Sequence, residues 1–439
     1  MMLWTKRFTK SKKQSDSRKY LKLITSEGIS GGLLGSMLGG PFLTGFMLYL
    51  GASSAQIGFA LAIPAFANLA QIFTAIITHN VDNRRAYVFG YGVLYRVLWV
   101  LTGLIPFVLP QSYWVYTFIA LYLLSYLCSN IAGVIWASLI GDMVPAQVRG
   151  RYMGIRNTIV GGLAAAAVLA GGQILELFSK QNGFIILYII AAVCMVWNGY
   201  HLFSYPNLPY ERSQESQKLK LLVKPLKDRS FVRATLFLAA WIFFQNMAIP
   251  LFSYVMQEVL SISIQWVSVI TTVQLIVMMT SYYVWGNLNA KYGTKRVLRW
   301  TLPIIAASCL LWGGIAWIPA IPVLILVHML LGIGTGGFTQ LTFNFTIEEA
   351  PSSERTIYVA VFAALTGFTG FLSPILGGEI YRNLKTMPAW VEHYGFSVGM
   401  GLVLLGLALT AGRSMLSTNQ ESYSRAASAI RDQQEELAS

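Results

Sequence analysis

The chain has 439 residues, of which 55% are hydrophobic and only 11% are charged, and its net charge is +14. Soluble domains carry about 25% charged residues, so this composition excludes an ordinary soluble fold. Apolar runs of roughly 20 residues recur along the whole sequence, which is typical of a membrane protein with many spans.

The chain begins with a basic, polar stretch, residues 1–24, which we interpret as a tail. The apolar run after it is too long for the core of a signal peptide and has no obvious cleavage site, so it is the first predicted span. Twelve spans are predicted in all, over residues 25–50, 56–79, 87–109, 114–142, 154–178, 183–204, 232–257, 264–286, 298–318, 321–346, 356–381 and 393–413.

The basic residues are distributed very unevenly between the two sides of these spans. Nearly all of the 32 lysines and arginines fall on the side of the two termini; the exceptions are Lys180, Arg382, Lys385 and, within the third span, Arg96. The positive-inside rule therefore places both termini in the cytoplasm. The net charge reflects this topology, and we expect no nucleic-acid partner.

Two segments far apart in the sequence repeat each other at a single offset. Asp142, Pro145, Arg149 and Tyr152 correspond to Glu348, Pro351, Arg355 and Tyr358. We infer two copies of a six-span unit, parallel because each has an even number of spans, around a central cavity. The predicted fold is an all-α membrane protein with an N-terminal bundle (25–204), a cytoplasmic linker (205–231), a C-terminal bundle (232–413) and a cytoplasmic tail (414–439).

This layout resembles the major facilitator superfamily of secondary transporters. The loop that contains Gly286, Gly293, Lys295 and Arg296 is similar to the family's loop motif. The repeated element, in which six residues separate an acidic residue from an arginine, is similar to a second motif of the family. The first copy of the loop departs from the pattern, with Asn80 and Asn83 where the family usually has Asp and Gly. The family's drug-antiporter element is absent, since Val168 stands at its proline position. The resemblance implies alternating access and leaves the substrate open.

The repeated element places charges at helix ends where the helix dipole disfavours them. Asp142 and Glu348 close spans four and ten, while Arg149 and Arg355 precede the next spans. These charges are either ordinary interfacial residues that fix topology or parts of a cytoplasmic gate. The gate candidates are Asp142, Arg149, Glu348, Arg355, Arg84, Arg85, Gly286, Lys295 and Arg296.

Arg96 lies near the middle of the third span, and a charge within a span is a functional hypothesis by default. It either meets an anionic substrate group or is a structural anchor bonded to carbonyls or to polar residues of span two. Together with Arg96, the candidates for the lining of the central cavity are Asn68, Gln71, Tyr126, Asn130, Trp241, Gln245, Asn246, Thr335 and Thr339. These side chains either line the cavity or form hydrogen bonds between helices, and the sequence does not distinguish the two.

Glu27, Asp142 and His328 are the candidates for proton coupling, although none lies convincingly at the midplane. A stripe of Gly28, Gly32, Gly35 and Gly39 in the first span predicts close helix packing. Cysteine appears at three scattered positions, and neither a disulfide, a metal site nor a cofactor is expected.

The function predicted from these features is secondary active transport of a small neutral or amphipathic organic solute, with or without proton coupling, and with a preference for export. A lipid or glycolipid flippase on the same fold is one alternative, and a membrane-embedded transferase is another. The expected partners are the lipid bilayer and a small-molecule substrate, and the expected location is the plasma membrane, as a monomer.

Overall fold

A computed structural model describes residues 2–69, 83–144, 146–208, 225–348, 355–412 and 416, and every regular element in these ranges is a helix. The N-terminal half contains α1 (Met2–Leu38), α2 (Gly40–Tyr49), α3 (Ser54–Leu69), α5 (Arg84–Leu101), α6 (Ile105–Val108), α7 (Trp114–Met143), α8 (Ala146–Leu177) and α9 (Lys180–Phe203). The C-terminal half contains α11 (Arg229–Ala248), α12 (Phe252–Tyr254), α13 (Ile264–Tyr292), α14 (Thr294–Leu310), α15 (Ala320–Glu348), α16 (Arg355–Leu384) and α17 (Phe396–Leu409).

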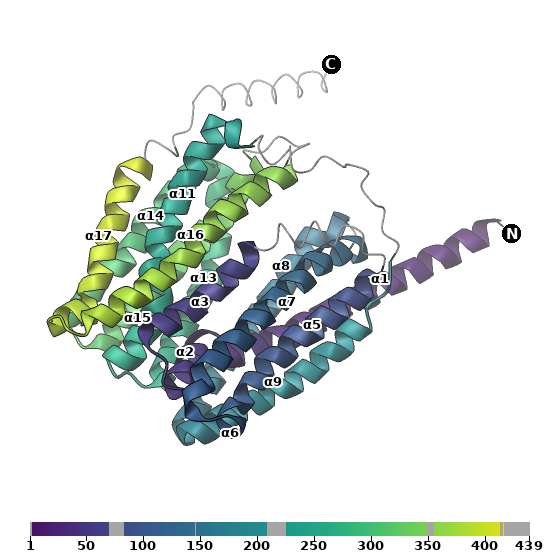
Figure 1. Cartoon of the computed structure of the whole chain (residues 1–439). Coiled ribbons are helices and arrows are strands. Elements are labelled where there is room, and N and C mark those ends of the chain that lie inside the picture. The colour runs from purple at the N-terminus through teal and green to yellow at the C-terminus, as the bar shows by residue number, and fades with distance from the viewer. Residues whose placement is uncertain are drawn as a thin grey trace, which may run out of the picture.

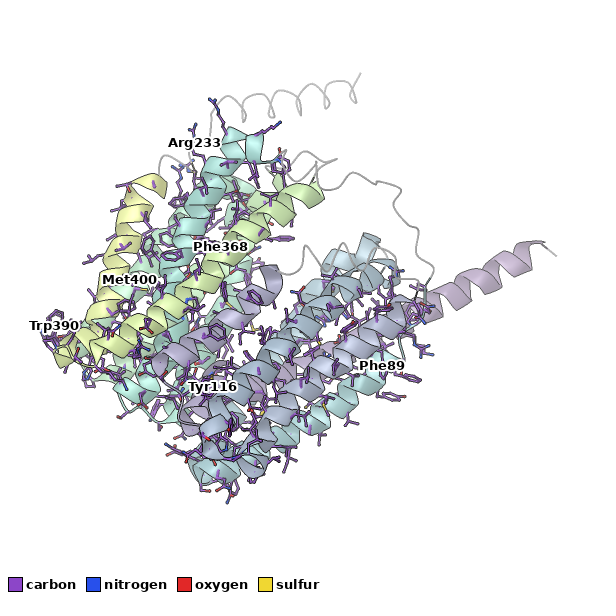
Figure 2. All side chains as sticks on the ribbon, in the orientation of Figure 1. Phe89, Tyr116, Arg233, Phe368, Trp390 and Met400 are labelled. Atoms are coloured by element: carbon purple, nitrogen blue, oxygen red, sulfur yellow. The ribbon has the colours of Figure 1, made fainter. Side chains whose placement is uncertain are left out.

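The helices match the predicted spans, except that residues 70–79 of the second predicted span, 56–79, lie outside the described residues. Within the described ranges, eleven helical segments are long and apolar enough to cross a membrane, and Ser54–Ala67 is a shorter apolar helix at the position of the second span. The outside of the bundle is apolar as well. Tyr116 and Trp390, for example, are 68% and 56% exposed, and Trp390 lies at the outer edge of the molecule in Figure 2. An apolar outer surface over helices is what a bilayer requires.

Local sequence explains where several helices begin and end. The first span is broken where Gly40 adopts a positive φ of 53° and Pro41 follows as the next residue of α2. Gly293, with a φ of 79°, separates α13 from α14. Asn83 stands where the family usually has glycine, and its side chain accepts a hydrogen bond from the Ala86 amide (3.1 Å) that caps α5.

The helices pack into two bundles joined mainly along two helix pairs, with further contacts of α2 to α12 and α13 (Figure 1). Within the N-terminal half α1 packs on α8 and α9, and α5 on α7 and α9. Within the C-terminal half α13 packs on α15, α14 on α15 and α17, and α11 on α16. Between the halves, α3 packs on α16 and α8 on α13.

The sequence repeat has a structural counterpart in two tyrosines. Tyr152, near the start of α8, donates a hydrogen bond to the Leu21 carbonyl of α1 (2.7 Å). Tyr358, its counterpart near the start of α16, donates to Asp228 at the start of α11 (3.5 Å) and packs its ring on Phe231 (4.7 Å). In both halves a tyrosine near the start of the helix of the fifth span thus bonds to the helix of the first span or to its N-cap residue.

The contacts between the halves lie away from the end at which α1 begins and α17 ends, which we call the terminal face. A Cβ atom at Gly58 would collide with the Pro374 carbonyl oxygen, and one at Gly172 would lie 2.5 Å from Ser268. Another α8–α13 contact, closer to the terminal face, joins Gly161 to Met279, whose sulfur lies 3.2 Å from a Cβ built on the glycine.

One turn closer to the terminal face, the same side of each helix is exposed. Asn157 lies four residues before Gly161 on α8, and Tyr283, 77% exposed, lies four residues after Met279 on α13. The described parts of the two halves therefore meet at the opposite face and separate towards the terminal face, as their divergence in Figure 1 also indicates.

Candidate functional site

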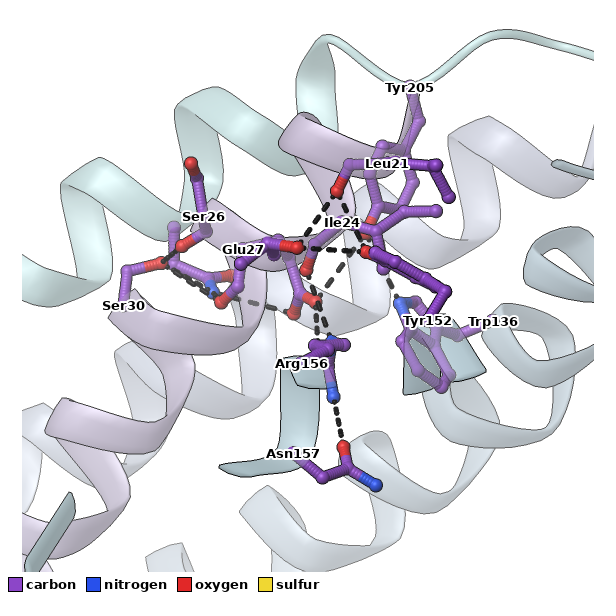
Figure 3. A network of polar contacts seen from close by, with 12 residues as sticks. Leu21, Ile24, Ser26, Glu27, Ser30, Trp136, Tyr152, Arg156, Asn157 and Tyr205 are labelled. Atoms are coloured by element: carbon purple, nitrogen blue, oxygen red, sulfur yellow. Dashed lines mark hydrogen bonds and ion pairs between the residues drawn. The ribbon is translucent and has the colours of Figure 1, made fainter. Parts of the chain in front are cut away.

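A buried cluster of charges lies inside the N-terminal half around Glu27 of α1, which is only 7% exposed (Figure 3). Its Oε1 atom lies 3.4 Å from Nη2 of Arg96 on α5, and its Oε2 atom lies 3.4 Å from Nη2 of Arg156 on α8. The two arginine side chains are 6% and 13% exposed. Burial of a charge is costly unless it is paired, so the ion pairs hold three helices together.

Two neutral donors complete the surroundings of the carboxylate. Asn198 of α9 donates to Glu27 Oε1 (3.5 Å) and, more closely, to the Glu27 carbonyl oxygen (2.8 Å). Tyr205 donates to Oε2 (3.5 Å) and accepts a hydrogen bond from Trp136. All four side-chain donors lie 3.4–3.5 Å from the carboxylate oxygens, longer than the 2.7–2.9 Å typical of charge-assisted hydrogen bonds.

Each arginine also has partners of its own. Arg96 donates to the Gly92 carbonyl (2.7 Å), and its guanidinium lies 4.3 Å from the Tyr95 ring. This placement, between an acid and a carbonyl, fits the structural-anchor alternative for Arg96. The bond to a carbonyl is one of the two contacts that the sequence suggested, and the acid is on α1 instead of span two.

Arg156 donates through Nε to the Ile24 carbonyl (3.3 Å) and through Nη1 to the Asn157 amide oxygen (3.1 Å), and its guanidinium lies 5.5 Å from the Trp136 ring. Its side chain therefore runs from the helix interface towards the exposed Asn157.

Two tyrosines at the edge of the cluster are held neutral. Burial raises the pKa of the Tyr152 hydroxyl above its ordinary value. Burial, reinforced by the negative charge of Glu27, raises the pKa of the Tyr205 hydroxyl well above its ordinary value. Both hydroxyls are therefore protonated near neutral pH and act as hydrogen-bond donors, Tyr205 to Glu27 and Tyr152 to Leu21.

The four central gate candidates occupy the helix ends that the sequence predicts. Asp142 lies in the last turn of α7 and Arg149 in the first turn of α8, while Glu348 ends α15 and Arg355 begins α16. Their side chains lie outside the described part of the structure, so their pairing stays a prediction.

The basic gate candidates with described side chains contact their own half. Arg84 donates to the Leu208 carbonyl (3.3 Å), and Arg85 to the Phe203 carbonyl (2.6 Å). In the C-terminal half, Lys295 lies 5.8 Å from the Phe345 ring, Arg296 lies 5.7 Å from the Tyr292 ring, and Gly286 faces Gln340. In this conformation none of the contacts named here crosses between the halves.

The cavity candidates are placed in different surroundings. Gln71 and the side chain of Asn68 lie outside the described residues. Tyr126 packs on Tyr122 (4.8 Å between ring centres) and Trp99 (5.9 Å), and Asn130 is buried.

In the C-terminal half, Trp241 is fully buried and donates to Gln245 (2.9 Å). Asn246 is partly exposed, Thr339 is exposed, and Thr335 donates to the Leu331 carbonyl (2.6 Å). His328 is buried with Nδ1 2.8 Å from the Leu324 carbonyl oxygen. Among the described members of this set, Thr339 is the most open to solvent, whereas Trp241 and His328 are enclosed.

The sequence interpretation singled out Glu27 and Arg96 but missed Arg156, Asn198 and Tyr205. Arg156 had been counted with the basic residues on the side of the termini, at the start of the predicted span 154–178, yet α8 places it inside the bundle. One signal was available: Gly28 and Gly31 flank Glu27 closely. A Cβ at Gly28 would overlap the Arg156 guanidinium, and one at Gly31 would lie 3.1 Å from Arg96 Nη2.

The comparison with family models decides the identity of the chain. The model of the Major Facilitator Superfamily matches residues 29–247 and again residues 234–429. The chain belongs to this superfamily. It is therefore a multi-pass integral membrane protein and a secondary transporter of small molecules, and not an enzyme, which removes the embedded transferase from the alternatives.

Known superfamily members share the fold at low identity. "MFS-type efflux pump MMF1" of Pseudozyma antarctica (strain T-34) is 29% identical over 164 residues, which are 37% of this chain and 28% of the relative's length. The nucleoside transporter NupG aligns with a TM-score of 0.62 and 15% identity over 92% of this chain and 99% of its own. The xylose transporter XylE of E. coli, in its inward-open conformation, aligns with a TM-score of 0.65 and 13% identity over 90% of this chain and 95% of its own.

Proposed function

We propose that the protein exports a small neutral or amphipathic organic solute across the plasma membrane by alternating access, working as a monomer. The observation that carries the proposal is the distribution of contacts between the halves. They meet through Gly58, Gly172 and Gly161, and separate beyond Asn157 and Tyr283. A carrier open on one side needs this arrangement, and the terminal face is the cytoplasmic side under the positive-inside rule.

The chemistry of the candidate cavity residues supports the substrate class. Amide, hydroxyl and aromatic groups predominate among them, as in Asn246, Thr339 and Tyr126. Such groups hydrogen-bond and stack without demanding a multiply charged partner. Efflux is favoured because the curated relative is named an efflux pump, although the match spans only 28% of that protein.

Proton coupling through Glu27 is part of the proposal. The carboxylate is buried between α1, α5 and α8, and an ionisable group within a span is a functional candidate for carrying protons. The gate residues Asp142, Arg149, Glu348 and Arg355 would close the terminal face through pairs near the surface, each worth about 0–1 kcal/mol.

Flux into proteoliposomes tests the proposal. The purified protein is reconstituted and offered labelled sugars, amphipathic drugs and fluorescent lipids, with and without a pH gradient. We expect saturable movement of an amphipathic solute, faster with the gradient, and no movement of lipids between leaflets. Empty liposomes and the Glu27→Gln variant serve as controls, the latter losing the response to the gradient. Lipid movement alone would instead establish a flippase, and movement of none of these would refute solute transport.

A further inference from the structure

The cluster around Glu27 contains more positive than negative charge. Two guanidinium groups, from Arg96 and Arg156, share a single carboxylate, and the other described partners, Asn198 and Tyr205, are neutral. An excess positive charge inside a low-dielectric bundle attracts an anion. The position that corresponds to Arg156 in the second repeat, at the offset of 206 residues, is the apolar Phe362, so the feature belongs to the N-terminal half alone.

The same cluster contains buried polar atoms that lack a hydrogen-bond partner. They are Nε of Arg96 and Oδ1 of Asn198, and neither has a partner among the described residues. Buried polar atoms are nearly always paired in native proteins, so these two leave capacity for a polar ligand beside the ion pairs.

Arg156 connects this cluster to the opening between the halves. On α8, Asn157 lies four residues before Gly161, which contacts Met279 of the other half, so both lie on the same side of the helix. Asn157 is exposed, and its amide oxygen accepts the 3.1 Å hydrogen bond from Arg156 Nη1. The guanidinium is therefore one hydrogen bond away from the space that opens at the terminal face.

We propose that Arg156 and Asn157 form an anion subsite that binds the single carboxylate or phosphate group of an amphipathic substrate entering from the terminal face. The planar guanidinium suits either oxyanion. Arg156 Nη2 lies 3.4 Å from Glu27, a length that leaves the guanidinium able to turn to a second oxyanion. The exposed ring of Tyr283, across the opening, offers a surface for the apolar part. This inference rests on the proposed function and narrows its substrate class.

Calorimetric titration of the whole protein in lipid nanodiscs, with empty nanodiscs subtracted, tests the subsite with three probes of one chain length: octanoate, octyl phosphate and neutral octanamide. Hydrogen bonds to a charged group predict that both anions bind about tenfold more tightly than octanamide. We expect Arg156→Gln to abolish this preference, Arg156→Lys to retain part of it, and Asn157→Ala to reduce it. Arg382→Gln, at an exposed arginine of α16, leaves the preference unchanged.

Two outcomes overturn the subsite: octanamide binding as tightly as the anions, or the preference surviving in Arg156→Gln. The first comparison uses the unaltered protein, so it decides the question even where a variant fails to fold. A carrier that moves neutral amphipathic solutes and does not prefer the anions would leave the transport proposal standing and remove this subsite. Binding of the anions without flux of any solute would leave the subsite standing and refute the transport proposal.

Discussion

Glu27 contributes to stability through charge pairing that no other described residue of α1 provides. Both Arg96 and Arg156 rely on this one carboxylate as their described acidic partner. A buried ion pair is weak evidence of net stabilisation when compared with an apolar pair, but loss of one member leaves an uncompensated buried charge. Removal of this single carboxylate is therefore expected to destabilise the cluster more than removal of any other group in it.

Glu27→Gln keeps the shape of the side chain and removes its charge. We expect the free energy of unfolding to fall by about 3–5 kcal/mol, because two buried guanidiniums then lack a counter-charge. Denaturant unfolding in detergent micelles, followed by tryptophan fluorescence, measures the loss. Glu379→Gln is the control, since Glu379 pairs with Arg382 on an exposed part of α16 and should cost about 0–1 kcal/mol. Equal losses in the two variants would contradict the assignment.

The sequence identified the members of this cluster only in part. Glu27 and Arg96 are conspicuous because they are charges within apolar runs. Their pairing could not be predicted from the sequence, because they are 69 residues apart and the neighbours of α1 depend on how the whole bundle packs. Arg156 was counted only as a basic residue on the side of the termini, because hydropathy does not show which neighbouring helix a side chain faces.

At the scale of the element, the glycines of α1 serve several purposes. The sequence predicted that Gly28, Gly32, Gly35 and Gly39 allow close helix packing. Gly32 does so, since its Cβ would lie 2.8 Å from Val160 of α8. Gly28 instead makes room for the Arg156 guanidinium, and a Cβ at Gly35 would meet nothing within 4 Å.

Gly28→Ala and Gly35→Ala form a matched pair on the same helix. The methyl group at residue 28 displaces the guanidinium from Glu27, and we expect a loss of about 1–3 kcal/mol in unfolding free energy, as in other overpacked sites. At residue 35 the methyl group has open space, and the higher helix propensity of alanine should leave stability unchanged or raise it by up to about 1 kcal/mol. Thermal unfolding of both variants measures the difference, and a Gly35→Ala loss as large as that of Gly28→Ala would refute this division.

Helix positions could be predicted from hydropathy, and helix bounds could not. The predicted span 25–50 is two helices, because positive φ at Gly40 breaks it, and α1 itself extends back to Met2. The predicted span 154–178 matches the apolar segment Ile155–Leu177, but the helix α8 that contains it already starts at Ala146. Polar residues continue a helix beyond the bilayer, and a pattern of apolar residues does not detect this extension.

At the scale of the whole molecule, the repeat and the alternation of charged and apolar stretches were sufficient to predict two bundles. Offset matching paired Tyr152 with Tyr358, and the structure gives the two side chains equivalent contacts. The relative tilt of the bundles is a different matter. It depends on small differences in free energy between two sets of contacts across α3–α16 and α8–α13, which local sequence does not record.

A pair of cysteines across the opening reports on closure. Asn157→Cys and Tyr283→Cys, with Cys128, Cys194 and Cys309 changed to serine, place thiols one turn beyond the Gly161–Met279 contact. We expect a disulfide to form only when the terminal face closes, to stop flux and to be reversed by a reductant. Adding Asp142→Asn should slow its formation, because the proposed gate is weakened.

Gly161→Cys with Met279→Cys is the positive control, because these positions are already in contact and should crosslink at a rate that Asp142→Asn leaves unchanged. Failure of the outer pair to crosslink in an actively transporting sample would show that the opening at Asn157 does not close during the cycle.

The Glu27–Arg96 pair also constrains how the chain is synthesised. Residues Lys19–Tyr49 form one of the two least hydrophobic of the eleven candidate spans, with a mean hydropathy of 1.3, and they reach the membrane with an acid that has no partner yet. Arg96 is inserted only after a further 69 residues have been made, and Arg156 and Asn198 later still. A charge within a span opposes partition into lipid. Until Arg96 and Arg156 follow, the unpaired carboxylate of Glu27 therefore raises the free-energy cost of placing the first span in the bilayer.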